Sequence, residues 1–275
     1  MNKKEINTNI YNEYIYENLI QVSKEIILPL YGKLRKDQIS FKSRLDDFVT
    51  IADKNSEEFL KPKLLNLIKG SNFIGEESYS EIDYFDNPVS DYTWTCDPID
   101  GTYNYVNNLD KFCTMISLCK SKVPIASWLY FPIFNIFCYS YLNSSVIFSD
   151  DKSKIKIFRK KNELQFEVIK GVNFIEDNLF KDFYPQKDKN GFTVAKNIRC
   201  AGFQIVALVC GKIDYLHHKY ITPWDHSPVF NLAKSSGCNI YLKPKEKTFY
   251  YNYSGQLLCV SSNLIYNELR KFNCI

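Results

Sequence analysis

The chain has 275 residues, of which 45% are hydrophobic and 24% are charged, and it carries a formal net charge of +4. This balance predicts a globular protein with a substantial core and argues against a disordered chain. The positive charge is spread along the sequence. Its densest run, residues 152–161, alternates with apolar residues as one solvated strand face does, so no nucleic-acid partner is expected.

The cysteine spacing and the N-terminal sequence indicate the cellular compartment in which the protein is expected. The nine cysteines stand at irregular spacings without a C-x-x-C pair, which argues against a disulfide framework or a zinc ribbon. A reducing cytoplasm is therefore the expected compartment. The first twenty residues are too polar for a signal peptide.

One segment, residues 123–142, is apolar enough to resemble a membrane span. Two prolines, one asparagine and two serines interrupt it, and each would leave a polar group unsatisfied in lipid. The segment is predicted instead to form two core strands joined by a turn near residues 131–135, and no membrane partner is expected.

Two helices are predicted in the first seventy residues. Apolar residues at spacings of three and four predict one buried helical face, made of Tyr11, Ile15, Leu19, Val22 and Ile26. Pro29 is expected to end or kink that helix. A second helix is predicted between Asp53 and Lys69, with Gly70 at its C-cap.

Strands dominate the middle of the chain, and helices return toward its end. Strands are predicted at residues 92–96 and 112–119, and residues 143–190 read as edge strands and loops. A helix followed by a strand is predicted from residue 199, then a helix closed by Gly237, then a strand at residues 257–262 and a last helix. This alternation favours a layered α/β or α+β protein with lobes at residues 1–145 and 146–275 that form one catalytic unit.

The stretch "WTCDPIDGTYNYV", residues 94–106, places two aspartates in one shaped turn. Asp97 and Asp100 would repel each other at the end of a buried strand unless a cation neutralised them, and Mg²⁺ prefers such oxygen ligands. If a helix begins after Gly101, the N–H groups of Gly101 and Thr102 favour an anion such as phosphate. The alternative is a surface Asp-Gly turn that carries an extra aspartate.

Three further turns carry carboxylates after apolar runs. They are "DDFVTIAD", which ends an extended run at Asp53, "GEES" with Glu76 and Glu77 at a strand end, and "PWDHSP" with Asp225 at a helix start. Each one alone could be a cap or a turn. Four such turns together are hard to explain as unrelated caps, and they indicate metal-assisted phosphoryl chemistry.

These blocks resemble the inositol monophosphatase family, which belongs to a wider group with fructose-1,6-bisphosphatases and bisphosphate nucleotidases. The family signature is similar to "WxxDPIDGTxNF", and here Tyr105 stands in its last place. The D-x-VT-x-x-D, GEES and WD blocks follow the family order. The resemblance implies a layered α-β-α-β-α sandwich and a phosphoric monoester hydrolase that is sensitive to lithium and forms a homodimer, as members of the family commonly do.

The resemblance also implies roles for individual residues. Two or three Mg²⁺ ions would be bound by Glu76, Asp97, the carbonyl of Ile99, Asp100 and Asp225, with Asp97 bridging two ions. Thr102, paired with Asp53, would position and deprotonate the attacking water, and Glu76 would help to hold it. The N–H groups of Gly101 and Thr102 would bind the phosphate. Lys42 would screen phosphate charge, or it is a solvated loop lysine.

The side of the site that receives the alcohol departs from the animal inositol enzymes. His218 stands where those enzymes have a glutamate, and bulky Phe203 and Gln204 follow Gly202. Both Gly202 and His218 are predicted to line the substrate side. The expected substrate is a small polyol or sugar phosphate. The alternatives are fructose-1,6-bisphosphatase, 3′(2′),5′-bisphosphate nucleotidase or histidinol-phosphate phosphatase activity, and a non-catalytic scaffold. His217, His218 and His226 lack metal-ligand spacing and are expected at the surface or pocket rim.

Overall fold

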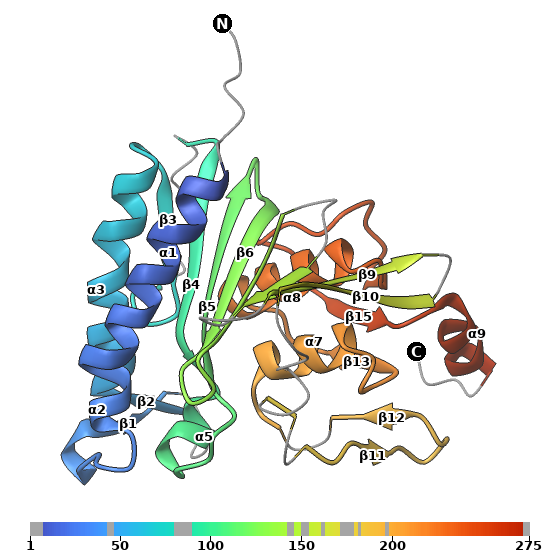
Figure 1. The fold of residues 1–275 in the computed structure, drawn as a ribbon, viewed down its shortest axis with the longest axis horizontal. Helices are drawn as coiled ribbons and strands as arrows, with labels where there is room; N and C mark the ends of the chain where they lie inside the picture. Colours follow the sequence, from blue (N-terminus) through green and yellow to red (C-terminus); the bar gives the residue numbers. More distant parts are fainter. Residues whose placement is uncertain are drawn as a thin grey trace, which may run out of the picture.

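Helices and sheets alternate in five layers across the molecule (Figure 1). The computed structural model describes residues 8–42, 47–79, 90–141, 146–149, 154–160, 163–170, 179–180, 183–195 and 198–271. Each helix layer packs against a sheet through apolar side chains, and separate apolar clusters fill the spaces between the layers. The expected α-β-α-β-α sandwich is confirmed.

The first sheet has eight strands and forms the centre of the fold. Its order is β10-β9-β8-β7-β6-β5-β4-β3, and every neighbouring pair is antiparallel except β3 and β4. The strands are β3 (Asn72–Gly75), β4 (Tyr92–Asp100), β5 (Cys113–Lys120), β6 (Val123–Phe131), β7 (Ile136–Tyr141), β8 (Val146–Ser149), β9 (Lys154–Lys160) and β10 (Glu163–Lys170). The pair of core strands predicted at residues 123–142 is confirmed as β6 and β7.

One layer of helices covers the outer face of this sheet (Figure 1). It contains α1 (Thr8–Val22), the π-helix η1 (Ser23–Ile27), α2 (Leu28–Leu30) and α3 (Ile51–Leu67). The predicted face is confirmed, since Ile15, Leu19 and Val22 are buried and Tyr11 and Ile26 are partly buried against the same cluster. Ile27 is fully buried as well, because the π-turn adds one residue to the helical repeat there.

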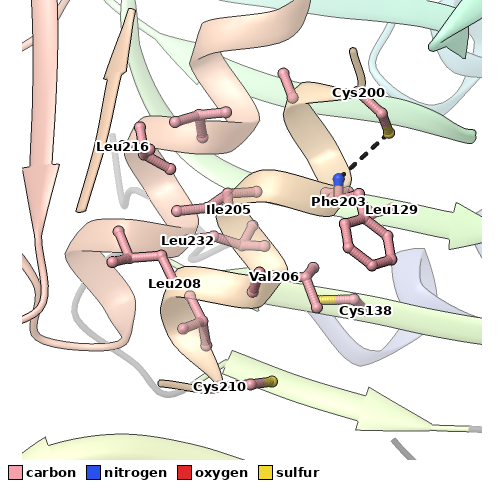
Figure 2. Close-up of a cluster of buried hydrophobic side chains, with 14 of the residues drawn as sticks. Leu129, Cys138, Cys200, Phe203, Ile205, Val206, Leu208, Cys210, Leu216 and Leu232 are labelled. Carbon is pink, nitrogen blue, oxygen red and sulfur yellow. Dashed lines mark hydrogen bonds between the residues drawn. The ribbon is translucent and has the colours of Figure 1, made fainter. Parts of the chain in front are cut away.

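The second helical layer, α7 (Ala201–Val209) and α8 (Pro223–Ser235), lies between the two sheets. Figure 2 shows side chains of α7 facing Leu129 and Cys138 of the large sheet and Leu232 of α8. The small sheet has the order β13-β15-β14 and contains β13 (Tyr215–His218), β14 (Asn239–Lys243) and β15 (Gln256–Val260). The last helix, α9 (Asn263–Lys271), covers its other face. The predicted C-terminal helices and strands are confirmed.

The remaining elements are short. They are η2 (Lys36–Gln38), the hairpin of β1 (Ile39–Phe41) and β2 (Phe48–Thr50), α5 (Thr102–Val106), and the pair β11 (Gln186–Lys187) and β12 (Thr193–Val194). The basic run predicted as a strand face coincides with β9, whose side chains lie outside the described residues. The lobe boundary predicted at residue 145 falls between β7 and β8 of one sheet. Of the helices that the structure describes, none has the length and apolar character to cross a membrane.

Candidate active site

The end of β4 brings two aspartates to the same side of the sheet. Residues three apart in a regular strand point to opposite faces. Here the pairing of β4 with β5 shifts between Asp97 and Asp100, so that β4 holds one residue more than β5 in this interval. Such a bulge re-aims a side chain, and Pro98, which lacks an N–H, lies within it. Carboxylate oxygens of Asp97, Asp100 and Asp225 consequently lie within 4.8 Å of one another.

Burial and mutual repulsion disfavour the charged forms of these carboxylates. Asp97 is 2% exposed, and its Oδ1 accepts the N–H of Ile99 at 2.9 Å. Burial, followed by the charges of Glu76 and Asp225, raises the pKa of Asp97 well above its ordinary value. Burial also raises the pKa of Asp100 to about 7, with a further contribution from Asp225. A bound cation would relieve both effects.

Asp225 is held at the start of α8. It occupies the first turn of that helix, as expected from the sequence, and the Thr222 hydroxyl donates to its Oδ2 at 2.8 Å. The N-terminus of α8 therefore points at the two aspartates of β4. Because β4 and α8 are far apart in sequence, only the packing of α8 on the sheet creates this group of three carboxylates.

A capping box fixes Asp53 beside Thr102. The sequence predicted Asp53 at the end of an extended run, but that was wrong, since the strand ends at Thr50 and Asp53 lies in the first turn of α3. The Thr50 N–H and hydroxyl donate to Asp53 Oδ2 at 2.8 and 2.6 Å, which leaves Oδ1 to the Thr102 hydroxyl at 3.1 Å. Burial raises the pKa of Asp53 to about 6, although the bonds from Thr50 oppose this.

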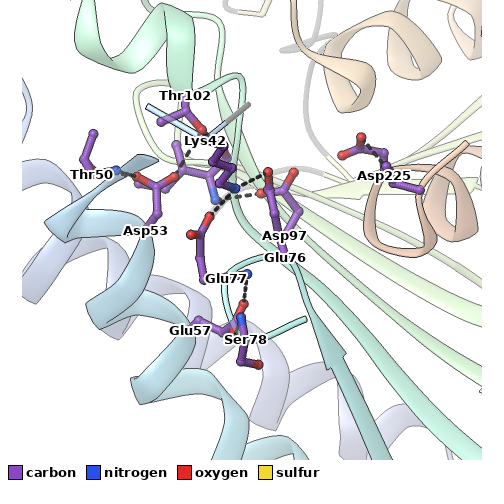
Figure 3. Close-up of polar contacts among 12 residues, drawn as sticks. Lys42, Thr50, Asp53, Glu57, Glu76, Glu77, Ser78, Asp97, Thr102 and Asp225 are labelled. Atoms are coloured by element: carbon purple, nitrogen blue, oxygen red, sulfur yellow. Dashed lines mark hydrogen bonds and ion pairs between the residues drawn. The ribbon is translucent and has the colours of Figure 1, made fainter. Parts of the chain in front are cut away.

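Lys42 bridges the two glutamates that follow β3 (Figure 3). Its Nζ lies 2.7 Å from Glu76 Oε1 and 2.7 Å from Glu77 Oε1. Burial disfavours the ammonium, but the two carboxylates outweigh it, and the pKa of Lys42 lies above its ordinary value. Burial raises the pKa of Glu76 to about 8; Lys42 opposes this shift and Asp225 adds to it.

Glu57 supports this turn, and the sequence analysis missed it. Its carboxylate is 3% exposed and accepts the backbone N–H groups of Glu77 at 2.8 Å and Ser78 at 2.9 Å. A Cβ on Gly75 would lie 2.2 Å from Glu57 Oε2, so only glycine leaves room for this contact. The available signal was the spacing of four between Asp53 and Glu57, which places both on one face of α3.

Replacing Glu57 with glutamine is expected to destabilise the protein by about 1–3 kcal/mol, because a buried carboxylate that accepts two part-buried N–H groups is replaced by an amide with one acceptor oxygen. The neighbouring exposed Glu58 provides a matched control, and E58Q should change stability by less than about 0.5 kcal/mol. Urea unfolding of the two variants measures the difference. Equal stabilities would contradict the role given to Glu57.

Two backbone N–H groups remain open at the turn into α5. Gly101 has a φ of +91°, and a Cβ there would lie 3.0 Å from the carbonyl oxygen of Lys111 and 3.2 Å from that of Arg199. The Thr102 hydroxyl also lies 2.9 Å from the carbonyl of Ile99. Among the described residues, no acceptor contacts the N–H of Gly101 or Thr102. A helix does begin after Gly101, which was the condition for an anion site there.

Gly202 and His218, the two residues predicted on the substrate side, contact different parts of the site. Gly202 contacts Asp100 directly, since its N–H donates to Asp100 Oδ2 at 2.6 Å. His218 ends β13, and its Nδ1 lies 2.9 Å from Nε2 of His226. Burial lowers the pKa of His218 to about 3 and that of His226 to about 4. The expected rim position was wrong for His226, which lies in the first turns of α8 and is 3% exposed.

The metal-free protein is expected to lose stability as the pH rises from about 6.5 through the pKa values of Asp100, about 7, and Glu76, about 8. Both values are raised on folding, so the native state holds protons that the unfolded chain has released, and each such proton costs about 1.4 kcal/mol per pH unit. The pKa values of His218 and His226 are lowered on folding, so these two residues make the stability rise with pH, but only below about pH 6.5. Thermal melts with a chelator and with Mg²⁺ measure this. Stability that rises with pH in the chelated sample would contradict it.

The donor set fits a hard divalent cation. Asp97, Asp100 and Asp225 offer carboxylate oxygens only, at separations that a single ion can span, and burial penalises leaving them charged and unpaired. A cavity of about 840 Å³ lies elsewhere, between β14 and α9. The candidate active site is therefore identified by its group of carboxylates and not by the size of a cavity.

Comparison with known proteins agrees with this geometry. The model of the inositol monophosphatase family matches residues 12–271. A "Fructose-1,6-bisphosphatase/inositol-1-monophosphatase" from Aquifex aeolicus is 31% identical over 78% of this chain and 78% of its own. An "Inositol monophosphatase" from Dictyostelium discoideum is 28% identical over 96% of each chain.

A solved structure, an IMPase/NADP phosphatase complexed with Mg²⁺ and phosphate, has the same fold. It superimposes with a TM-score of 0.70 at 14% identity, over 97% of this chain and 96% of its own. The family model, the relatives and the carboxylate cluster all point the same way. The chain belongs to the inositol monophosphatase family and is a phosphoric monoester hydrolase.

Proposed function

We propose that this phosphatase hydrolyses a small polyol or sugar phosphate with the help of Mg²⁺. One observation carries the proposal. The oxygen cluster of Asp97, Asp100 and Asp225 lies at the end of the same strand that leads into the Thr102–Asp53 pair. A cation site, a hydroxyl and a raised-pKa carboxylate together are the groups that metal-assisted ester hydrolysis requires.

The proposed metal ligands are the carboxylates of Glu76, Asp97, Asp100 and Asp225 and the carbonyl of Ile99. When bound there, two or three Mg²⁺ ions would lower the pKa of the attacking water and neutralise charge on the leaving ester oxygen. The structural relative solved with Mg²⁺ and phosphate supports this choice of ion. Lithium inhibition is part of the same proposal.

Thr102 and Asp53 are proposed to handle the proton of the attacking water. The Thr102 hydroxyl donates to Asp53, so its oxygen can accept a proton from water while its own proton passes to Asp53. A pKa of about 6 leaves Asp53 charged at neutral pH yet basic enough to take that proton. Glu76 would help to hold the water.

The phosphate and the alcohol are proposed to contact different elements. The open N–H groups of Gly101 and Thr102 are suited to phosphate oxygens, and Lys42 brings a positive charge to the same edge. Gly202 and His218 are proposed on the side of the alcohol. A neutral imidazole differs from a carboxylate in hydrogen bonding, so His218 favours an alcohol other than that of the animal inositol enzymes.

Assembly and location complete the proposal. A homodimer in a reducing cytoplasm is proposed, and the eight cysteines among the described residues are free thiols, which supports a reducing compartment. The substrate is a small phosphorylated metabolite. Nucleic acid and membranes are not proposed as partners.

A panel of phosphate esters tests the proposal. Purified protein with Mg²⁺ is offered inositol 1-phosphate, sugar phosphates, fructose 1,6-bisphosphate, a 3′,5′-bisphosphate nucleotide and histidinol phosphate, and released phosphate is measured. Release is expected from a polyol or sugar monophosphate and should stop with a chelator. Preference for one of the last three esters would select that alternative activity. No release from any ester would favour a non-catalytic scaffold and overturn the proposal.

A further inference from the structure

Two buried thiols lie in direct contact with Asp100. Cys113 comes from β5 and is 0% exposed, and Cys200 precedes α7 and is 2% exposed. The two Sγ atoms are 4.0 Å apart. Asp100 Oδ2 lies 3.0 Å from Cys200 Sγ and 3.7 Å from Cys113 Sγ. One oxygen and two sulfurs therefore form a compact triangle.

The dimensions of this triangle are those of one face of a tetrahedral metal site. Zinc binds thiolate sulfur at about 2.3 Å, so two sulfurs on one tetrahedral ion lie about 3.8 Å apart. The separation of 4.0 Å between the thiols and the 3.7 Å from Cys113 to Asp100 are close to that length. Only the 3.0 Å contact from Cys200 must open by a few tenths of an ångström, and it is now a hydrogen bond.

The start of α7 already stabilises negative charge at these atoms. The N–H groups of Ala201 and Gly202 donate to Asp100 at 3.0 and 2.6 Å, and the N–H of Phe203 donates to Cys200 Sγ at 3.3 Å. Figure 2 shows the last contact at the start of the helix. A sulfur that receives an N–H at a helix N-terminus is placed as a thiolate would be. A Cβ on Gly202 would lie 2.4 Å from Cys113 Sγ, so glycine is needed for this approach.

We propose that Asp100, Cys113 and Cys200 form a site for one thiophilic divalent cation, of which Zn²⁺ and Cd²⁺ are the probes. Binding exchanges two thiol protons for one metal ion, and both protons leave to solvent without any change of oxidation state. Hard Mg²⁺ does not favour sulfur ligands, so the thiol site and the carboxylate cluster select different kinds of ion.

Occupation of the thiol site has a consequence for the enzyme. Asp100 is the residue common to the thiol triangle and to the cluster with Asp97 and Asp225. An ion held by the thiols takes Asp100 Oδ2 as a ligand and adds a second positive charge beside the first site. Zn²⁺ is therefore expected to inhibit in competition with Mg²⁺. This consequence rests on the proposed function, whereas binding to the thiols does not.

Cadmium titration of the full chain tests the site, because thiolate-bound Cd²⁺ absorbs in the ultraviolet and oxygen-bound Cd²⁺ does not. One equivalent should produce this absorption in the parent protein. The variant C113A/C200S should bind Cd²⁺ at least about 100-fold more weakly. Loss of a residue that only supports a metal ligand already weakens binding by about 10- to 100-fold, and this variant loses two ligands. The serine in this variant keeps a favourable helix cap.

The control variant C119A/C210S removes two other buried thiols from the same strand and helix, and it should titrate like the parent. Absence of the absorption in the parent, or its persistence in C113A/C200S, would overturn the proposal. Should C113A/C200S fail to fold, ¹¹³Cd NMR of the parent still separates sulfur from oxygen ligation, and an oxygen-only signal would also overturn it. If the protein binds cadmium through its thiols but hydrolyses none of the esters, the proposed metal site is supported and the proposed function is contradicted.

Discussion

Asp97→Asn is expected to lower kcat by about 10³-fold. Metal ions supply several kcal/mol of charge stabilisation in such reactions, and each 1.4 kcal/mol corresponds to a factor of ten. The negative charges of Glu76, Asp225 and Asp100 all act on Asp97, so Asp97 lies among the other proposed metal ligands. Asparagine keeps an oxygen that can accept the N–H of Ile99, so the turn itself should survive.

The same substitution should stabilise the metal-free protein, because it removes a buried charge from a group of like charges. Calorimetry with a chelator should show a higher Tm for the variant, and added Mg²⁺ should raise its Tm less than that of the parent. Asp91→Asn is the matched control, since Asp91 is exposed and stands just before the same strand. A lower Tm in the metal-free variant, or full activity, would contradict the role of Asp97.

Thr102→Val is expected to lower kcat by about 10²-fold or more, the usual contribution of a positioned proton-transfer group. Valine has nearly the shape of threonine but cannot bond Asp53 Oδ1 or the carbonyl of Ile99. Thr102→Ser restores the hydroxyl and should recover most of the activity. The effect should appear in kcat more than in KM.

A double-variant cycle tests whether Thr102 and Asp53 act together. Asp53→Asn alone should also lose activity, although it keeps one carbonyl oxygen for the bonds from Thr50. If the two residues form one proton path, the double variant T102V/D53N should be little worse than either single variant. Multiplicative losses would show that the residues act separately.

The sequence was most informative where chemistry and local structure coincide. The end of β4 and the turn after it carry Asp97, Pro98, Asp100 and Gly101 in that order, and those residues indicated both a cation site and an open N–H pair. Helix periodicity near the N-terminus identified Ile15, Leu19 and Val22 as core residues. It did not indicate the burial of Ile27, because a π-turn depends on how the helix packs and leaves no clear mark in the pattern.

Contacts between distant segments were beyond sequence reasoning. Glu57 reads as one of several charged residues on α3, and its role appears only when the GEES turn lies against it, twenty residues further along the chain. The thiol pair is similar, since Cys113 and Cys200 are 87 residues apart and no spacing rule joins them. His218 and His226 form a buried pair that their spacing in the sequence did not indicate.

The sequence by itself determined the layered fold class, most of the helices and strands, and the set of carboxylates from which phosphate-ester chemistry was inferred. These follow from periodicity and from residue types, which are local properties of the chain. Tertiary structure alone decided which oxygens meet: a bulge in β4 turns Asp97 and Asp100 to one side, and the packing of α8 brings Asp225 to them. It also placed the two thiols in contact with Asp100, because such proximity arises from the docking of α7 on the large sheet.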